Sequence, residues 1–123
     1  MTQEKLENTV IELFLDYGDE TSSLLLNQLE HLEVKKREFT GIGFFTHFHS
    51  PDNLKVENIS KTYEDLSVDI KDPDDNMHFL LFIKNGSISC LEAFTFRGWK
   101  QEDLSRIDPD SFYGGGRSAF FSD

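Results

Sequence analysis

Residues 77–95 read MHFLLFIKNGSISCLEAFT, two apolar runs joined by the pair Asn85-Gly86. An Asn-Gly pair in this setting is typical of a β-hairpin with a two-residue type I′ turn. Because both faces of the hairpin are largely apolar, we expect it in the middle of a covered sheet. A regular register pairs Ile83 with Ile88, Leu81 with Cys90, Phe79 with Glu92 and Met77 with Phe94.

Apolar residues at helical spacing predict two helices within residues 1–33. Thr2 is a candidate cap for the first helix, and Asp19 or Thr21 for the second. The expected buried stripes are Leu6, Val10, Leu13, Phe14 and Tyr17 in the first helix, and Leu25, Leu29 and Leu32 in the second.

One long or broken strand is expected at residues 38–48, further strands at 54–60 and 66–71, and a short helix at 101–107. Gly41 and Gly43 suggest a bulge or a close backbone approach in the first of these strands. Ser118 to Phe121 can form a last strand or stay loose, within a tail at 108–123 that can be loosely ordered. The sequence therefore predicts a single α+β domain over residues 1–123. Two N-terminal helices pack on a mostly antiparallel sheet of four to six strands, with the 77–95 hairpin at its centre.

The 123 residues carry 12 Lys and Arg against 23 Asp and Glu, a net charge of −11. Residues 1–33 hold eight acidic residues and one lysine, and residues 52–76 hold eight acidic and three basic ones. Such a chain repels nucleic acid and anionic lipid, and attracts a basic protein surface. No apolar run reaches the length of a membrane helix, and no apolar segment follows the N-terminus. With one cysteine, Cys90, the chain cannot form an intrachain disulfide, so we expect the cytoplasm.

No metal, cofactor or catalytic site is expected from spacing. His47 and His49 lie two apart, yet zinc needs three or four ligands, and nothing in the sequence joins Asp52 or His78 to them. Cys90 lacks the electropositive, exposed surroundings of a reactive thiol.

Glu92 is the strongest candidate for a catalytic residue. The regular register places it among Ile83, Leu81 and Phe94, where a carboxylate needs a partner or a raised pKa. A general acid has such surroundings, and so does a structural ion pair with Arg97 or a lysine. The structural interpretation is the more common of the two.

Two segments resemble those of a family of small bacterial proteins. Residues 39–48, FTGIGFFTHF, resemble the pattern FTGxGFFTxF, and residues 79–96 with Trp99 resemble FxLFIxxGxIxxLExxTF followed by W. Some members of this family resemble immunity proteins of contact-dependent or polymorphic toxin systems. The resemblance covers about a quarter of the chain, and implies a toxin as partner and no catalytic residues.

The leading hypothesis is a non-enzymatic acidic protein that neutralises a basic toxin effector, such as a nuclease, by direct binding. The candidate contacts are Asp16, Asp19, Glu20, Glu64, Asp65, Asp69, Asp72, Asp74 and Asp75. One alternative is a small hydrolase or ligand-binding domain that uses Glu92 with His47, His49 or His78. The other is a structural subunit that self-associates through exposed aromatic residues among Trp99, Phe112, Phe120 and Phe121.

Overall fold

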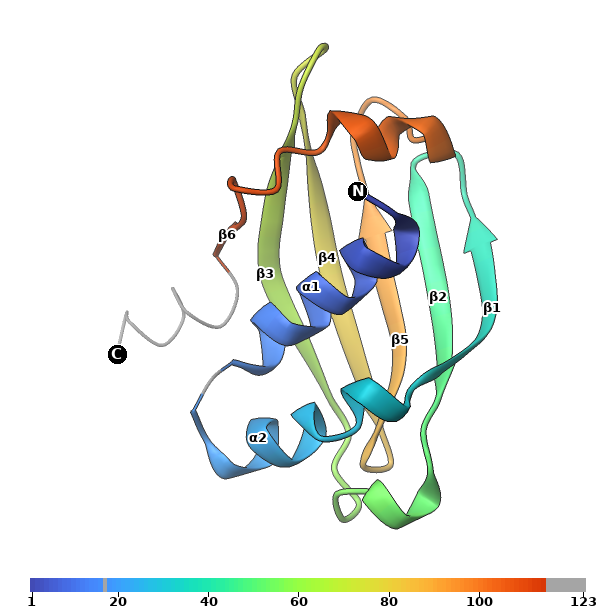
Figure 1. The fold of residues 1–123 in the computed structure, drawn as a ribbon, viewed down its shortest axis with the longest axis vertical. Coiled ribbons are helices and arrows are strands. Elements are labelled where there is room, and N and C mark those ends of the chain that lie inside the picture. The colour runs from blue at the N-terminus through green and yellow to red at the C-terminus, as the bar shows by residue number, and fades with distance from the viewer. Residues whose placement is uncertain (17, 115–123) are drawn as a thin grey trace.

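A six-stranded antiparallel sheet forms the middle of the fold, and two helices lie across one of its faces (Figure 1). The computed structural model describes residues 1–16 and 18–114. The strands are β1 (Glu33–Phe39), β2 (Gly43–His49), β3 (Lys61–Ile70), β4 (Asp75–Lys84), β5 (Ser87–Phe94) and β6 (Tyr113–Gly114). Their order in the sheet is β1-β2-β5-β4-β3-β6, so the β4–β5 hairpin is central, as expected. The α+β prediction is confirmed.

The two N-terminal helices are confirmed as well. α1 (Gln3–Leu15) begins after Thr2, whose hydroxyl accepts a hydrogen bond from the backbone N–H of Lys5 at 3.1 Å. α2 (Glu20–Leu26) is capped by Asp19 and is followed by a short 3₁₀ helix, η1 (Leu29–His31). α1 contributes side chains with no exposed surface to the core: Leu6, Val10, Ile11 and Phe14. Tyr17 lies outside the described residues.

The hairpin turn is type I′, because both of its central residues have left-handed backbone angles. Asn85 has φ 51° and Gly86 has φ 80°. A Cβ atom at position 86 would overlap the carbonyl oxygens of Glu57 and Val56, so glycine is required there on two grounds.

A β-bulge at Ser89 overturns the expected register beyond the turn. Ile83 pairs with Ile88, as expected, but Phe82 pairs with Cys90, which leaves Ser89 as an extra residue. The expected pairs Leu81–Cys90, Phe79–Glu92 and Met77–Phe94 are therefore wrong. The observed pairs are Leu81–Leu91, Phe79–Ala93 and His78–Phe94. Because side chains alternate between the faces of a strand, one extra residue moves every later side chain to the other face.

Two of the expected strands also differ. Residues 38–48 do not form one strand but the turn and parts of β1 and β2, which form a hairpin. Gly43 does mark a close approach, since a Cβ there would overlap the carbonyl oxygen of Ala93 on β5. Residues 54–60 form no strand: η2 (Asp52–Leu54) and irregular backbone lead to β3, and Val56 donates a hydrogen bond to the Gly86 carbonyl at 2.9 Å.

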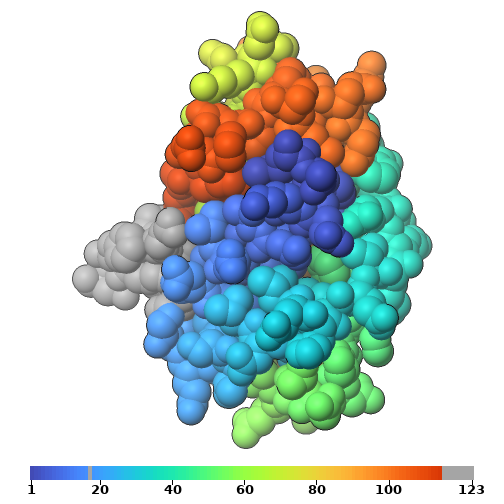
Figure 2. Space-filling view, viewed as in Figure 1, coloured from blue at the N-terminus to red at the C-terminus, as the bar shows by residue number. Residues whose placement is uncertain are grey.

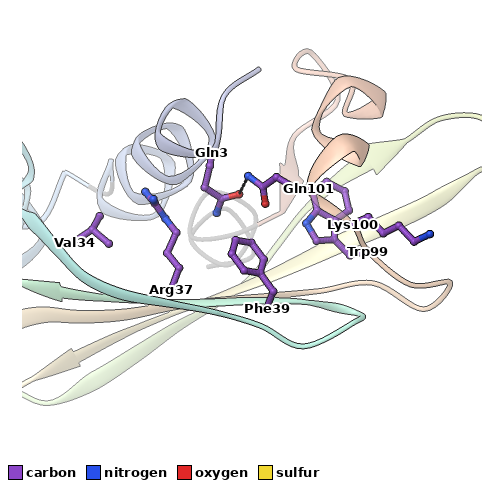
Figure 3. Close-up of a pocket in the computed structure, with 7 residues that line it drawn as sticks. All are labelled: Gln3, Val34, Arg37, Phe39, Trp99, Lys100 and Gln101. Carbon is purple, nitrogen blue, oxygen red and sulfur yellow. Dashed lines mark hydrogen bonds between the residues drawn. The ribbon is translucent and has the colours of Figure 1, made fainter.

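The helices of the described residues cover one face of the sheet (Figures 1 and 3). The opposite face, called here the outer face, is therefore not covered by these helices, contrary to what the apolar hairpin suggested. Aromatic side chains shield it instead: His78, Phe94 and Phe96 pack together with ring centroids 5.3–6.1 Å apart. This mutual packing leaves most of the outer face half-buried.

The C-terminal part follows the β3 side of the sheet. The expected short helix is a 3₁₀ helix, η3 (Gln101–Arg106). Asp108 then donates its backbone N–H to the Asp69 carbonyl at 3.0 Å, and β6 pairs with Leu66 and Ser67 of β3. The expected strand at Ser118 to Phe121 lies outside the described residues.

Candidate functional site

The β3–β4 hairpin carries four of the nine candidate acidic residues at or next to its tip: Asp69, Asp72, Asp74 and Asp75. This acidic tip projects at one end of the molecule, where its atoms are yellow-green in Figure 2. Asp72 has φ 57°, in the left-handed region, which lets the chain reverse there. The hairpin geometry therefore brings together carboxylates that are up to six residues apart in the sequence.

The acidic tip is held in place by the C-terminal part of the chain. One terminal nitrogen of Arg106 donates to the carbonyl oxygens of Lys71 and Pro73, at 3.2 and 3.3 Å. The backbone N–H of Lys71 donates to the Arg106 carbonyl at 2.9 Å. These bonds fix the tip before any partner arrives, which lowers the entropic cost of binding.

Two of the four carboxylates at the tip have structural roles. Asp69 accepts a hydrogen bond from the Asn76 side chain at 2.8 Å. Asp75 accepts one from the backbone N–H of Arg97 at 2.9 Å and another from that of Asn76 at 2.7 Å. Within the described residues Asp72 and Asp74 have no hydrogen bond or ion pair, and both are exposed. These two are free to contact a partner.

A depression of about 310 Å³ lies at the base of the acidic tip. It is lined by Asp69, Ile70, Lys71, Asp74, Asp75 and Asn76. Lys71 is engaged with Asp108, whose carboxylate lies 3.2 Å from the ammonium nitrogen. The backbone N–H of Asp110 and the ammonium of Lys71 lower the pKa of Asp108, so this acid stays ionised. The depression thus presents carboxylates to solvent in a geometry that suits a guanidinium or ammonium group.

The other five candidates lie elsewhere. Asp16, Asp19 and Glu20 are exposed at the α1–α2 junction, toward the opposite end of the molecule from the acidic tip (Figure 1). Glu64 and Asp65 are exposed at a bulge in the middle of β3, where Asp65 has φ 77°. The structure therefore places the nine candidates in three groups along β3 and not in one patch.

Asp19 has a structural role of its own. Partial burial raises its pKa, but hydrogen bonds from Ser22 and the charge of Lys61 more than offset this and lower the pKa below its ordinary value. Its carboxylate caps α2, so only part of it is available to a partner.

The placement of Glu92 expected from a regular register is wrong. The bulge at Ser89 turns Glu92 to the outer face, where it is half-buried between Phe45 of β2 and Leu80 of β4. Within the described residues Glu92 has no hydrogen-bond or ion-pair partner, so neither the expected pair with Arg97 nor one with lysine is present.

The histidines named with Glu92 bind other groups. His47 shares a hydrogen bond of 2.7 Å with Glu38, and His78 shares one of 2.7 Å with Ser67. His49 is exposed at the end of β2. In residues 1–16 and 18–114, no group of three His, Cys, Asp or Glu side chains can hold a metal ion. The structure thus does not join Glu92 to a histidine by a hydrogen bond.

Of the aromatic residues named for self-association, the two that the structure describes, Trp99 and Phe112, do not form an exposed surface. Trp99 is 4% exposed, and Phe112 packs against Phe79 in the core. Phe120 and Phe121 lie outside the described residues. Among the described residues, the exposed aromatic side chains are others: Phe39 on β1, Phe96 after β5 and Tyr113 on β6.

Two buried polar residues were not found from the sequence. Glu7 is 1% exposed and accepts hydrogen bonds from Arg37, Thr46 and Gln3. Gln28 has no exposed surface and bonds to Leu54, Gly86 and Ile88. The position of Glu7, three and four residues before the core residues Val10 and Ile11, was the one available signal for its burial.

No known protein family, characterised protein or solved structure matches this chain. Among the described residues, no helix is both long and apolar enough to cross a membrane.

Proposed function

We propose that this chain is a non-enzymatic binding protein that captures a basic protein partner through the acidic tip of its β3–β4 hairpin. The observation that carries the proposal is the fixed presentation of Asp72 and Asp74 beside an acidic depression. Carboxylates held in this way can pair with arginine or lysine, and the net charge of −11 speeds the approach of a basic partner.

The partner class that fits best is a toxin effector with a basic active surface, such as a nuclease. An acidic protein can cover the surface on which a nuclease binds phosphates, because carboxylates occupy the same cationic sites. The resemblance of residues 39–48 and 79–96 to segments of immunity-like proteins supports this proposal. The inhibitor would act in the cytoplasm of the cell that makes both proteins, without contacting nucleic acid itself.

Binding at the acidic tip is tested with an octa-arginine peptide by calorimetry in 50 mM NaCl. The double variant Asp72→Asn/Asp74→Asn should bind at least fivefold more weakly than the unaltered protein. The matched control is Glu12→Gln/Glu30→Gln, which removes the same charge from exposed positions on α1 and η1. Equal weakening in both double variants would mean that diffuse charge binds the peptide, and the acidic tip would lose its assigned role.

The inhibitory role is tested by sequencing the neighbouring reading frames for a toxin domain and co-expressing any such domain with this protein. The unaltered chain should restore growth, the Asp72→Asn/Asp74→Asn variant should fail to do so, and the Glu12→Gln/Glu30→Gln variant should succeed. Rescue by all three proteins would contradict the proposal, as would the absence of any rescue.

A further inference from the structure

β1 forms one edge of the sheet, and the strands that carry the acidic tip, β3 and β4, lie toward the other edge. In the described part of the chain it pairs with β2 alone, so its other side offers unpaired backbone N–H and C=O groups. Lys35, Lys36 and Arg37 lie on this strand, with a bulge at Lys35. In a chain of net charge −11, β1 carries three cations against two acids, Glu33 and Glu38, and Lys36 lies 3.6 Å from the Glu38 carboxylate.

An open groove runs beside this edge on the helix side of the sheet (Figure 3). Its volume is about 630 Å³, and the start of α1, β1 and residues 99–101 form its walls. The lining residues are Gln3, Val34, Arg37, Phe39, Trp99, Lys100 and Gln101. Val34 and Phe39 are 41% and 54% exposed, which is unusual for large apolar side chains that share a cavity.

The groove contains an unsatisfied donor. Trp99 is 4% exposed, and within the described residues its indole N–H is buried without a hydrogen-bond partner. In Figure 3 this ring nitrogen lies on the side of Trp99 that faces the cavity. A buried donor without an acceptor costs free energy, which an oxygen atom of a bound chain would recover.

Two cations flank the same groove. Arg37 is fixed by Glu7, to which it donates from Nε and one terminal nitrogen at 2.8 and 2.7 Å. These hydrogen bonds raise the pKa of Arg37, whose side chain is 30% exposed and lines the groove. Lys100 is exposed at the other end of the cavity. The groove therefore favours a ligand that is apolar in one part and negatively charged in another.

We propose that β1 and this groove form a docking site for an extended peptide segment of a partner protein, with alternating apolar and acidic residues. The segment pairs with the free edge of β1 and extends the sheet. Its apolar side chains enter the groove between Val34, Phe39 and Trp99. The acidic residues between them point to the opposite face, where Lys36 lies, and an acidic residue beyond the paired stretch faces Lys100. This mode combines main-chain hydrogen bonds with a pocket for alternate side chains.

Two central antiparallel registers of a second copy would oppose like charges at this edge. If two β1 strands pair antiparallel about Lys36, then Lys35 faces Arg37. If the pairing shifts so that Lys35 faces Lys36, then Glu33 faces Glu38. Like charges directly opposite one another destabilise strand pairs. The charges that disfavour self-pairing are those that favour an acidic partner strand.

The site is tested with the peptide Ac-Ser-Glu-Val-Glu-Phe-Glu-Ser-amide. Trp99 is the one tryptophan of the chain, so its fluorescence reports directly on the groove. We expect a saturable change in emission, and binding at least tenfold weaker for Phe39→Ala and for Lys100→Gln. The matched controls, Phe96→Ala and Lys84→Gln, change exposed residues outside the groove and should bind as the unaltered protein does.

Three comparison ligands separate the alternatives. A peptide with lysine in place of glutamate, and an acidic peptide N-methylated at alternate amides, should both bind at least tenfold more weakly. Equal binding of either peptide, or phenylpropionate as tight as the acidic peptide, would overturn the docking of an acidic strand. So would self-association that the acidic peptide disrupts. The Asp72→Asn/Asp74→Asn variant should bind the acidic peptide normally, because this site is independent of the proposed function.

Discussion

Glu7 and Arg37 link the core of the protein to its β1 edge. The carboxylate of Glu7 accepts hydrogen bonds from Arg37, from the Thr46 hydroxyl at 2.6 Å and from the Gln3 amide at 2.9 Å. A buried carboxylate is tolerated when donors surround it in this way. The same contacts hold the arginine that lines the groove, so a core residue sets the geometry of a surface site.

Glu7→Gln should therefore lower the free energy of unfolding by about 2–3 kcal/mol, because it leaves the guanidinium of Arg37 without its charged partner. Urea unfolding followed by circular dichroism measures the loss. The control is Glu4→Gln, an exposed residue one turn earlier, which should change stability by less than about 0.5 kcal/mol. Equal stability of the Glu7 variant and the unaltered protein would mean that the network contributes nothing.

Cys90 should be an unreactive thiol in the folded protein. Burial raises its pKa from 9.0 to about 11, and the charges of Glu92 and Glu38 add to this effect. At pH 8 the folded chain should react with a disulfide reagent roughly 100-fold more slowly than the chain unfolded in urea, because the thiolate is the reactive form. Glu92→Gln should speed the reaction of the folded protein. Reaction of folded and unfolded chains at the same rate would contradict this.

The raised pKa of Cys90 also makes the free energy of unfolding depend on pH above pH 9. Between pH 9 and about 11 the folded state keeps a proton on Cys90 that the unfolded state has lost. The contribution of this thiol is therefore fully present below pH 9 and disappears as the pH rises to about 11. Cys90→Ala should remove that part of the pH dependence.

Among the helices and strands, the bulge in β5 has the largest effect, because it decides which side chains of that strand point into the core. Ser89 and Cys90 both border one cavity on the outer face, while Ile88 before them and Leu91 after them point into the core. The extra residue therefore lets both halves of β5 point their apolar side chains into the core.

Deletion of Ser89 should therefore be tolerated at a cost of about 1–2 kcal/mol, since it restores regular alternation without moving any core residue. Deletion of Leu91 is the control and should cost more stability, because the core loses a leucine and Cys90 or Glu92 takes its position. Thermal unfolding of the two variants checks the prediction. If both deletions lower Tm by the same amount, Ser89 is not the extra residue of the bulge.

Local sequence patterns predict most of the helices and strands, but not which residues pair between strands or bond across the fold. The Asn85-Gly86 turn is confirmed, as is the burial of Leu6, Val10 and Phe14 in the first helix, because these signals depend on neighbouring residues alone. Of the second stripe, Leu25 is buried in α2, whereas Leu29 and Leu32 are half-buried in and after η1. The bulge was not visible, since a strand with apolar residues on both faces fits either register. Gln28 was missed because its partners, Leu54, Gly86 and Ile88, are 26 or more residues away in the sequence.

At the scale of the whole molecule, charge is distributed unevenly. The nine candidate acidic residues gather at the hairpin tip, the β3 bulge and the α1–α2 junction, while Lys35, Lys36 and Arg37 lie on the β1 edge. Sequence counts show an excess of acid in residues 1–33 and 52–76, but only the fold separates the nine candidates into three groups. The groove at β1 could not be predicted, because it joins residues from both ends of the described chain.

This surplus of acid should make the protein more stable as salt is added. Raising NaCl from 20 to 300 mM should increase Tm by about 3 °C, because screening weakens the repulsion among carboxylates. The Asp72→Asn/Asp74→Asn variant should show a smaller increase, since it removes two charges from the acidic tip. A fall in Tm with salt would indicate that attractive pairs outweigh the repulsion.

The anchoring of the β4–β5 turn also bears on how the protein ages. Asparagine followed by glycine loses its side-chain amide when the glycine nitrogen attacks the asparagine side chain. Here the Gly86 nitrogen donates to the Ile59 carbonyl at 2.7 Å, and the Gly86 carbonyl is held by Val56 and Gln28. Spontaneous deamidation at Asn85 should therefore require local opening of the turn. The fraction of deamidated Asn85 in an aged sample would then report how often this turn opens.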